Sequence, residues 1–351
     1  MASSRLRPLR VLLFVAALLA IVAARSADAN PGLTAEWPDP ATLPQVVQEN
    51  VTIASTSPYL FTDVGTERAS ATTVNATLFL PPGPHAPHSL PAVVMLHGSG
   101  GVLASRELTY GKQLAAMGIA VLVVDSFGGR PERGNSYIER LLNITETMLV
   151  ADGYAALGNL ATRPEIDPKR VVLVGFSYGA MAAMYALMTD VADRMAPPGL
   201  RYAGHVSFYG PCVARFEDHR TTGAPLLMLY GGDDQVIDHE RCSAFADDLR
   251  AGGSKVDVVV YPGAVGQWDG PFGRRLFGRN VSPCDFEVAR DGTVHDRGNG
   301  VVMKNQATRQ VLLSLCVTDK PYPIGRDDAV RRQSDRDFGR FLARVFQLPT
   351  E

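Results

Sequence analysis

Residues 171–188 read VVLVGFSYGAMAAMYALM, and this stretch decides the fold. Its first four residues are apolar and precede a glycine, which predicts a buried strand, whereas the apolar residues after Gly179 recur at the spacing of a helix face. Ser177 is therefore predicted to lie on a strand-to-helix turn. Gly175 and Gly179 let backbone segments approach closely at such a turn, and the helix directs its first N–H groups toward the serine. This is the G-x-S-x-G pattern of a nucleophile elbow.

The rest of the chain supplies the context that an elbow needs. Continuous apolar strands are predicted at 92–96, 119–124, 202–208, 225–230 and 256–261, and helices at 106–117, 144–157 and 239–251. This alternation is typical of an α/β fold with a mostly parallel sheet covered on both faces. The pentapeptide alone would also fit a glycine-bounded turn with a solvated serine, but the α/β context favours the elbow.

The first 29 residues are predicted to be a secretory signal peptide. Arg5, Arg7 and Arg10 precede an apolar run from Val11 to Ala23, and an A-x-A pattern ends at Ala29. A retained membrane anchor is the alternative, although the run is shorter than the ~20 apolar residues that span a bilayer. We expect an exported protein, periplasmic or secreted, with no membrane span after cleavage.

Residues 30–72 are predicted to form an N-terminal extended arm and first strand, and residues 73–351 a single α/β domain with an insertion at about 271–300. The chain of 351 residues has a formal net charge of −2 and no basic stripe for nucleic acid. We therefore expect a small-molecule substrate and no nucleic-acid partner. His85 and His88 have metal-like spacing but no third ligand nearby, so no metal site is predicted.

Four cysteines in an exported chain predict two disulfides. Of the three possible pairings of Cys212, Cys242, Cys284 and Cys316, we favour Cys212 with Cys242 and Cys284 with Cys316. Free buried thiols are the alternative.

Two further strand ends carry residues suited to acyl transfer. The strand ending at Leu96 runs into HGSGG, where the backbone N–H of Ser99, together with that of Tyr178, is predicted to form an oxyanion hole. The strand ending YGG precedes two aspartates, and a carboxylate there suits a Ser-Asp-His triad. We select Asp234 as the triad acid because Asp233 better fits a turn or a helix cap.

Several motifs together resemble the dienelactone hydrolase family of α/β-hydrolases: GFSYGA, LHGSGG, VVDSFGGR, YGGDDQVIDHERC and YPGA, over about residues 73–347. The resemblance implies an α/β-hydrolase fold and hydrolysis of carboxylic esters or lactones through a covalent acyl-enzyme, without metal or organic cofactor. Members that open dienelactones usually carry cysteine at the elbow, so Ser177 resembles the serine-type esterase branch. Arg130 loosely resembles an arginine that the family uses to bind a substrate carboxylate; a surface ion pair is the alternative.

One departure from the family pattern concerns the catalytic base. The family's histidine follows YPGA by two residues, where this chain has Gly266, although Trp268 and Asp269 keep the surrounding frame. We expect the glycine to leave a void about the size of an imidazole. His295, in the predicted insertion, is the candidate replacement base; a solvated loop histidine is the alternative.

These observations lead to three hypotheses. The first is an exported serine hydrolase of esters or lactones, impaired by loss of the triad histidine. The second is a non-catalytic protein that binds a small molecule in the retained pocket. A purely structural exported domain is disfavoured, because packing gives no reason to keep both an elbow and an oxyanion loop. The sequence does not predict the oligomeric state.

Overall fold

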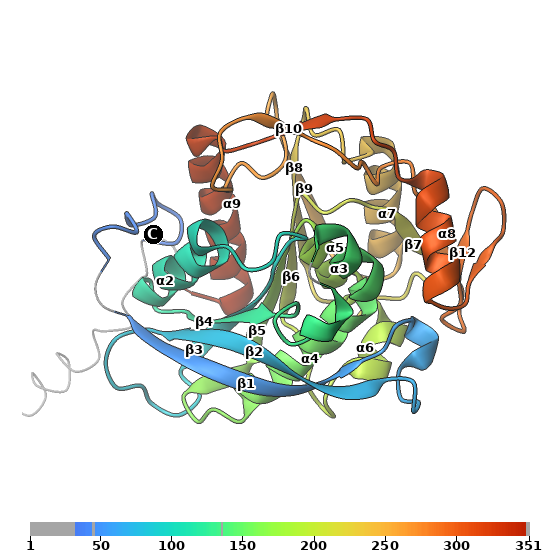
Figure 1. Ribbon diagram of the computed structural model, residues 1–351. Coiled ribbons are helices and arrows are strands. Elements are labelled where there is room, and N and C mark those ends of the chain that lie inside the picture. Colours follow the sequence, from blue (N-terminus) through green and yellow to red (C-terminus); the bar gives the residue numbers. More distant parts are fainter. Residues whose placement is uncertain (1–31, 44–45, 135, 349–351) are drawn as a thin grey trace, which may run out of the picture.

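The computed structural model describes residues 32–43, 46–134 and 136–348 (Figure 1). The predicted signal peptide, residues 1–29, lies outside the described residues. The central sheet has eight strands in the order β1-β2-β4-β3-β5-β6-β8-β9. Their bounds are β1 (Val47–Ser57), β2 (Ser70–Leu80), β3 (Leu90–Leu96), β4 (Ala120–Asp125), β5 (Ile166–Phe176), β6 (Gly204–Phe208), β8 (Leu226–Gly231) and β9 (Val256–Tyr261).

The sheet is antiparallel at one edge and parallel elsewhere. β1 pairs antiparallel with β2, and β2 pairs antiparallel with β4, whereas the remaining neighbours run parallel. The strands predicted from residue 92 onward are all present, and the predicted domain boundary at residue 73 falls inside β2. Since parallel strands end at one edge of a sheet, the loops after β3, β5 and β8 meet there.

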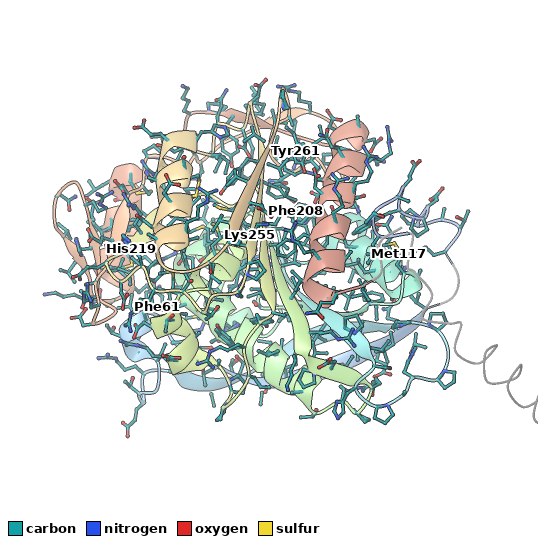
Figure 2. All side chains as sticks on the ribbon, turned by 180° about the vertical axis from the view of Figure 1, so that it is seen from behind. Phe61, Met117, Phe208, His219, Lys255 and Tyr261 are labelled. Atoms are coloured by element: carbon teal, nitrogen blue, oxygen red, sulfur yellow. A yellow bond between two sulfur atoms is a disulfide. The ribbon has the colours of Figure 1, made fainter. Side chains whose placement is uncertain are left out.

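Helices cover both faces of this sheet. The helices of the described residues are α2 (Thr109–Ala116), α3 (Tyr137–Asn143), α4 (Glu146–Ala161), α5 (Tyr178–Tyr185), α6 (Thr189–Met195), α7 (His239–Ala251), α8 (Gln306–Cys316) and α9 (Asp328–Phe346), of which α8 lies in the region beyond the sheet described below. Val94 belongs to the core under α4 and α5, whereas its neighbours Val93 and Met95 belong to the core under α2 and α9. This alternation is the strand period of two. Figure 2 shows Phe61 and Met117, which belong to the two different cores, on opposite sides of the sheet.

A region that we name the cap, residues 271–324, lies beyond the carboxyl ends of the strands (Figure 1). Its strands are β10 (Arg275–Phe277), β11 (Phe286–Val288), β12 (Val294–Asp296), β13 (Val302–Met303) and β14 (Tyr322–Ile324), and it includes α8. β11 to β13 form a four-stranded sheet with β7 (Ala214–Phe216), and β10 pairs with β14. The predicted insertion at 271–300 is thus part of a larger folded unit.

The chain has two disulfides, one within the cap and one between the segment after β6 and α7. Cys212 pairs with Cys242, and Cys284 pairs with Cys316, which confirms the favoured pairing. The first bond joins the segment after β6 to α7, and the second joins the end of α8 to the loop before β11. Within the described residues, no helix is both long and apolar enough to cross a membrane.

Candidate active site

Ser177 sits on a strained turn between β5 and α5. Its backbone angles are φ 50° and ψ −106°, a region that residues with a side chain rarely occupy. Such a conformation costs on the order of 1–3 kcal/mol and is kept only where the surroundings impose it. Here the N–H of Ser177 donates to the carbonyl of Phe208 at 2.9 Å, which ties the elbow to the end of β6.

The two glycines of the elbow are required by backbone packing. A Cβ on Gly175 would overlap the carbonyl oxygen of Gly179, and a Cβ on Gly179 would overlap the carbonyl oxygens of Leu96 and His97. These neighbours are backbone atoms at the end of β3 and in the first turn of α5, so they cannot swing aside as a flexible side chain would. The G-x-S-x-G spacing therefore reflects a close contact between the elbow and the loop after β3.

The loop after β3 packs directly against the elbow. The N–H of Gly101 donates to the carbonyl of Gly98 at 3.0 Å, which closes a tight turn. A Cβ on Gly98 would lie 3.6 Å from the Cβ of Ser177. Ser99, inside the turn, lines the same cavity as Ser177 and Tyr178. The oxyanion-hole roles of the Ser99 and Tyr178 N–H groups remain a prediction that this arrangement suits.

Asp234 follows β8 and is a buried carboxylate. It is 4% exposed, and its Oδ1 accepts the N–H of Val236 at 3.0 Å. Burial raises the pKa of Asp234 to about 6 because water no longer stabilises the ionised form. Asp234 does not itself line the cavity that contains Ser177, whereas its hydrogen-bond partner Val236 and Gln267, which follows Gly266, do. Asp233, in contrast, is exposed.

The expected void at Gly266 is absent. A Cβ on Gly266 would overlap Oδ2 of Asp234 and lie 3.2 Å from its Cγ. The carboxylate itself therefore occupies the place where a side chain at this position would begin. On its other side, Gly266 accepts the N–H of Gly325 at 3.1 Å, which holds this segment against the end of the cap.

His295 does not lie in the cavity with Ser177. It is on β12, where the adjacent Val294 lines the cavity, and neighbouring strand residues point to opposite faces. Nε2 of His295 lies 3.7 Å from Oε2 of Glu287 on β11. The predicted base therefore faces away from the site. The other six histidines are also absent from the residues that line the cavity: His85, His88, His97, His205, His219 and His239.

Arg130 is a buried structural residue. It is fully buried, and its two Nη atoms donate to the Asp152 carboxylate at 2.7 and 2.8 Å. Its remaining N–H groups donate to Ser57 Oγ and to the carbonyls of Ser126 and Thr56. All five guanidinium N–H groups are thus used inside the protein. This environment matches neither the predicted substrate contact nor a surface ion pair.

The cavity above Ser177 has a volume of about 460 Å³. It lies between α3, α4, α5, the segment after β6 and the cap, and most of its lining is apolar. Arg309 on α8 also lines it; this side chain is 6% exposed and pairs with Glu146 at 3.0 Å. The sequence analysis missed α8 and Arg309. The signal that would have found the helix is Asn305, whose side chain accepts the N–H of Thr308 and caps α8.

Comparison with known proteins agrees with this geometry. The model of the dienelactone hydrolase family matches residues 74–266. The chain belongs to the dienelactone hydrolase family. This confirms the resemblance and the α/β-hydrolase fold.

Two curated relatives and one solved structure illustrate the match. The acyl-protein thioesterase 1 homolog 1 of Dictyostelium discoideum is 22% identical over 141 residues, which cover 40% of this chain and 57% of the relative. A Salmonella typhimurium protein provisionally named a carboxymethylenebutenolidase is 30% identical over 105 residues, 30% of this chain and 38% of the relative. The chain thus spans little more than half of the first relative and less than half of the second. The dienelactone hydrolase-like promiscuous phosphotriesterase P91, from metagenomic libraries, has a TM-score of 0.47 and 17% identity, covering 77% of this chain and 99% of its own.

Proposed function

We propose that this family member is a carboxylic ester hydrolase in which Ser177 forms a covalent acyl-serine. The observation that carries the proposal is the strained backbone of Ser177 at the edge of a 460 Å³ cavity. Strained residues of this kind cluster at active sites, so a chemical role for the serine explains why the turn is retained.

The reaction proceeds in two steps. Oγ of Ser177 attacks the ester carbonyl carbon, and the carbonyl electron pair moves onto oxygen, where the N–H groups of Ser99 and Tyr178 are proposed to stabilise it. Collapse of this intermediate breaks the bond to the alcohol, which leaves with the proton from Ser177. Water then attacks the acyl-serine, releases the carboxylic acid and returns the proton to Ser177.

The acceptor proposed for the proton of Ser177 is Asp234, through a water, because Asp234 does not itself line the cavity whereas Val236 and Gln267 beside it do. What supports this choice is that Gly266 carries no side chain and that the Asp234 carboxylate lies where a Cβ on this glycine would be. With a pKa of about 6 it is ionised at pH 8 and is a stronger base than an exposed aspartate. Loss of a triad histidine costs on the order of 10⁶ in turnover. A slow enzyme is therefore expected.

The protein is further proposed to be exported, to the periplasm or the medium. The two disulfides support this proposal, because such bonds form and persist in oxidising compartments. Sequencing the amino terminus of the protein recovered from the native cell envelope or medium tests it. A mature chain beginning at Asn30 is expected, and an intact Met1 in that fraction would contradict cleavage.

Labelling with a fluorophosphonate probe tests the activated serine. The probe should label the folded chain at Ser177, and Ser177→Ala should abolish the label. Chain that has been reduced and unfolded is the control and should not react, because activation depends on the elbow. Absence of label on folded parent protein would overturn the covalent mechanism.

A non-catalytic binding protein is the second candidate. The observation that favours it is that none of the histidines within the described residues lines the cavity, while the cavity itself is retained. This candidate predicts that folded parent protein binds a cavity ligand, gives no label and releases no alcohol from an activated ester.

A further inference from the structure

The walls of the cavity are predominantly apolar. Met181 on α5, Val213 after β6, Phe286 on β11 and Leu313 on α8 approach it from four separate elements. Cavities of about 300–1,000 Å³ enclose most of a ligand of drug-like size, and an apolar lining rewards burial of hydrocarbon. The volume of about 460 Å³ is far larger than an acetyl group requires.

The charged side chains that line the cavity are paired with one another. Arg309 contacts Glu146 at 3.0 Å, and both are mostly buried. At the solvent-exposed rim, Arg279 lies 3.9 Å from Asp319. Nε of Arg309 is buried without a hydrogen-bond partner among the described residues. A substrate carboxylate approaching it would nevertheless meet the negative charge of Glu146 as well, so the pair offers that carboxylate little net attraction.

Arg130, the arginine that sequence resemblance assigned to a substrate carboxylate, is saturated by Asp152 and backbone carbonyls. Burial of an unpaired carboxylate in an apolar cavity is strongly unfavourable. The site thus combines a large apolar volume with cations that are already neutralised.

We propose that the cavity selects neutral esters with a long or bulky apolar acyl group and rejects esters whose acyl group carries a carboxylate. The proposal rests on the ester hydrolase function proposed above, since it names the substrate class of that same site. This substrate preference would distinguish the chain from hydrolases that act on lactones carrying a carboxylate.

Three activated esters test the selection on the intact, disulfide-bonded chain. They are 4-nitrophenyl acetate, 4-nitrophenyl octanoate and the 4-nitrophenyl monoester of octanedioic acid, which has the same chain length and a terminal carboxylate. We expect kcat/KM for the octanoate to be at least tenfold higher than kcat/KM for the acetate. It should also be at least tenfold higher than kcat/KM for the charged ester. Equal values for the octanoate and the charged ester would overturn the proposal.

Two substitutions on α8 connect the selection to the cavity. Leu313 lines the cavity, whereas Leu315, two residues later, is 67% exposed and does not line it. Leu313→Trp should reduce the preference for octanoate over acetate at least fivefold, while the identical change Leu315→Trp should leave it unaltered. An equal effect of both substitutions would place the acyl group elsewhere.

Binding of two ketones, measured by calorimetry, separates this proposal from catalysis. 2-Decanone resembles the neutral acyl chain, and 9-oxodecanoate adds a carboxylate; neither can be hydrolysed. Preferential binding of 2-decanone without ester hydrolysis would retain the selectivity and refute the hydrolase function. Hydrolysis of all three esters at similar rates, with no ketone preference, would retain the hydrolase and refute the selectivity.

Discussion

Gly266 and Asp234 face each other so closely that a Cβ on the glycine would overlap Oδ2 of the aspartate. The family resemblance predicts the catalytic histidine at this glycine. In this chain the Asp234 carboxylate lies where the side chain of such a histidine would begin, and its Oδ1 accepts the N–H of Val236 at 3.0 Å. Placing a histidine at position 266 would therefore require the Asp234 side chain to move as well.

Gly266→His should raise kcat/KM on an activated ester by about 10²-fold. The imidazole supplies the base that a serine nucleophile requires, and the gain is a fraction of the ~10⁴ or more that a triad member contributes. The short Asp234 side chain must first swing out of the overlap, toward a position from which it can accept an imidazole N–H. Steady-state kinetics on purified, folded variant checks the gain.

Gly266→Ala is the control for that substitution. It introduces the same Cβ, and the same overlap with Asp234, but no base. Alanine should therefore lower stability and leave activity no higher than in the parent chain. A folded histidine variant that is no faster than the alanine variant would show that an imidazole at this position does not reach the serine.

Ser177→Gly should stabilise the fold by about 1 kcal/mol while abolishing ester hydrolysis. Glycine adopts a positive φ of 50° without the strain that serine bears. Ser177→Ala removes the same hydroxyl but keeps the Cβ, so this variant should lose activity without gaining stability. Chemical denaturation of the three proteins measures the difference; equal stability of the glycine and alanine variants would argue against strain at the elbow.

The parts of the site that the sequence predicted are those set by local chain geometry. The elbow around Ser177 and the turn at Ser99 follow directly from glycines placed next to apolar strands, and Asp234 from its place at a strand end. Each depends on a few neighbouring residues and on the rule that parallel strands end together. The favoured disulfides also joined cysteines that are near in sequence.

The parts that the sequence did not predict depend on contacts between distant segments. His295 lies in the expected insertion, but the alternation of β12 turns it toward Glu287 instead of the cavity. Arg130 follows a strand end as expected, yet Asp152 on α4, which no motif marks, neutralises it. The Asp234 carboxylate beside Gly266 is likewise a packing result, because a sequence shows a missing side chain but not what fills its place.

The stability of the fold should depend on the ionisation of Asp234. Its pKa is about 6 in the folded chain against an ordinary value of 3.8, so the folded state binds the proton more tightly. The stabilisation is complete below about pH 4 and is lost as pH rises through 6. Asp234→Asn removes this titration, so the variant should gain up to about 3 kcal/mol relative to the parent between pH 4 and pH 7.

Urea unfolding at several pH values checks this dependence. Asp233→Asn is the matched control, because it makes the same change at the exposed neighbouring residue. Its difference from the parent should be nearly constant across the same pH range. A constant difference for Asp234→Asn would contradict burial of the carboxylate.

The two disulfides should contribute equally to stability but differently to activity. They join residues separated by 30 and 32 positions, so the loop-constraint model assigns each about 3–4 kcal/mol. Only the second has a cysteine, Cys284, among the residues that line the cavity, and it joins the cap loop to the end of α8.

Replacing Cys284 and Cys316 by serine should therefore widen the range of acyl groups accepted, measured as a smaller ratio of octanoate to acetate hydrolysis. Replacing Cys212 and Cys242 by serine should lower the unfolding free energy by a similar amount and leave that ratio closer to the parent value. An unchanged ratio in a folded chain without the Cys284–Cys316 bond would mean that the cap holds the shape of the cavity through its other contacts alone.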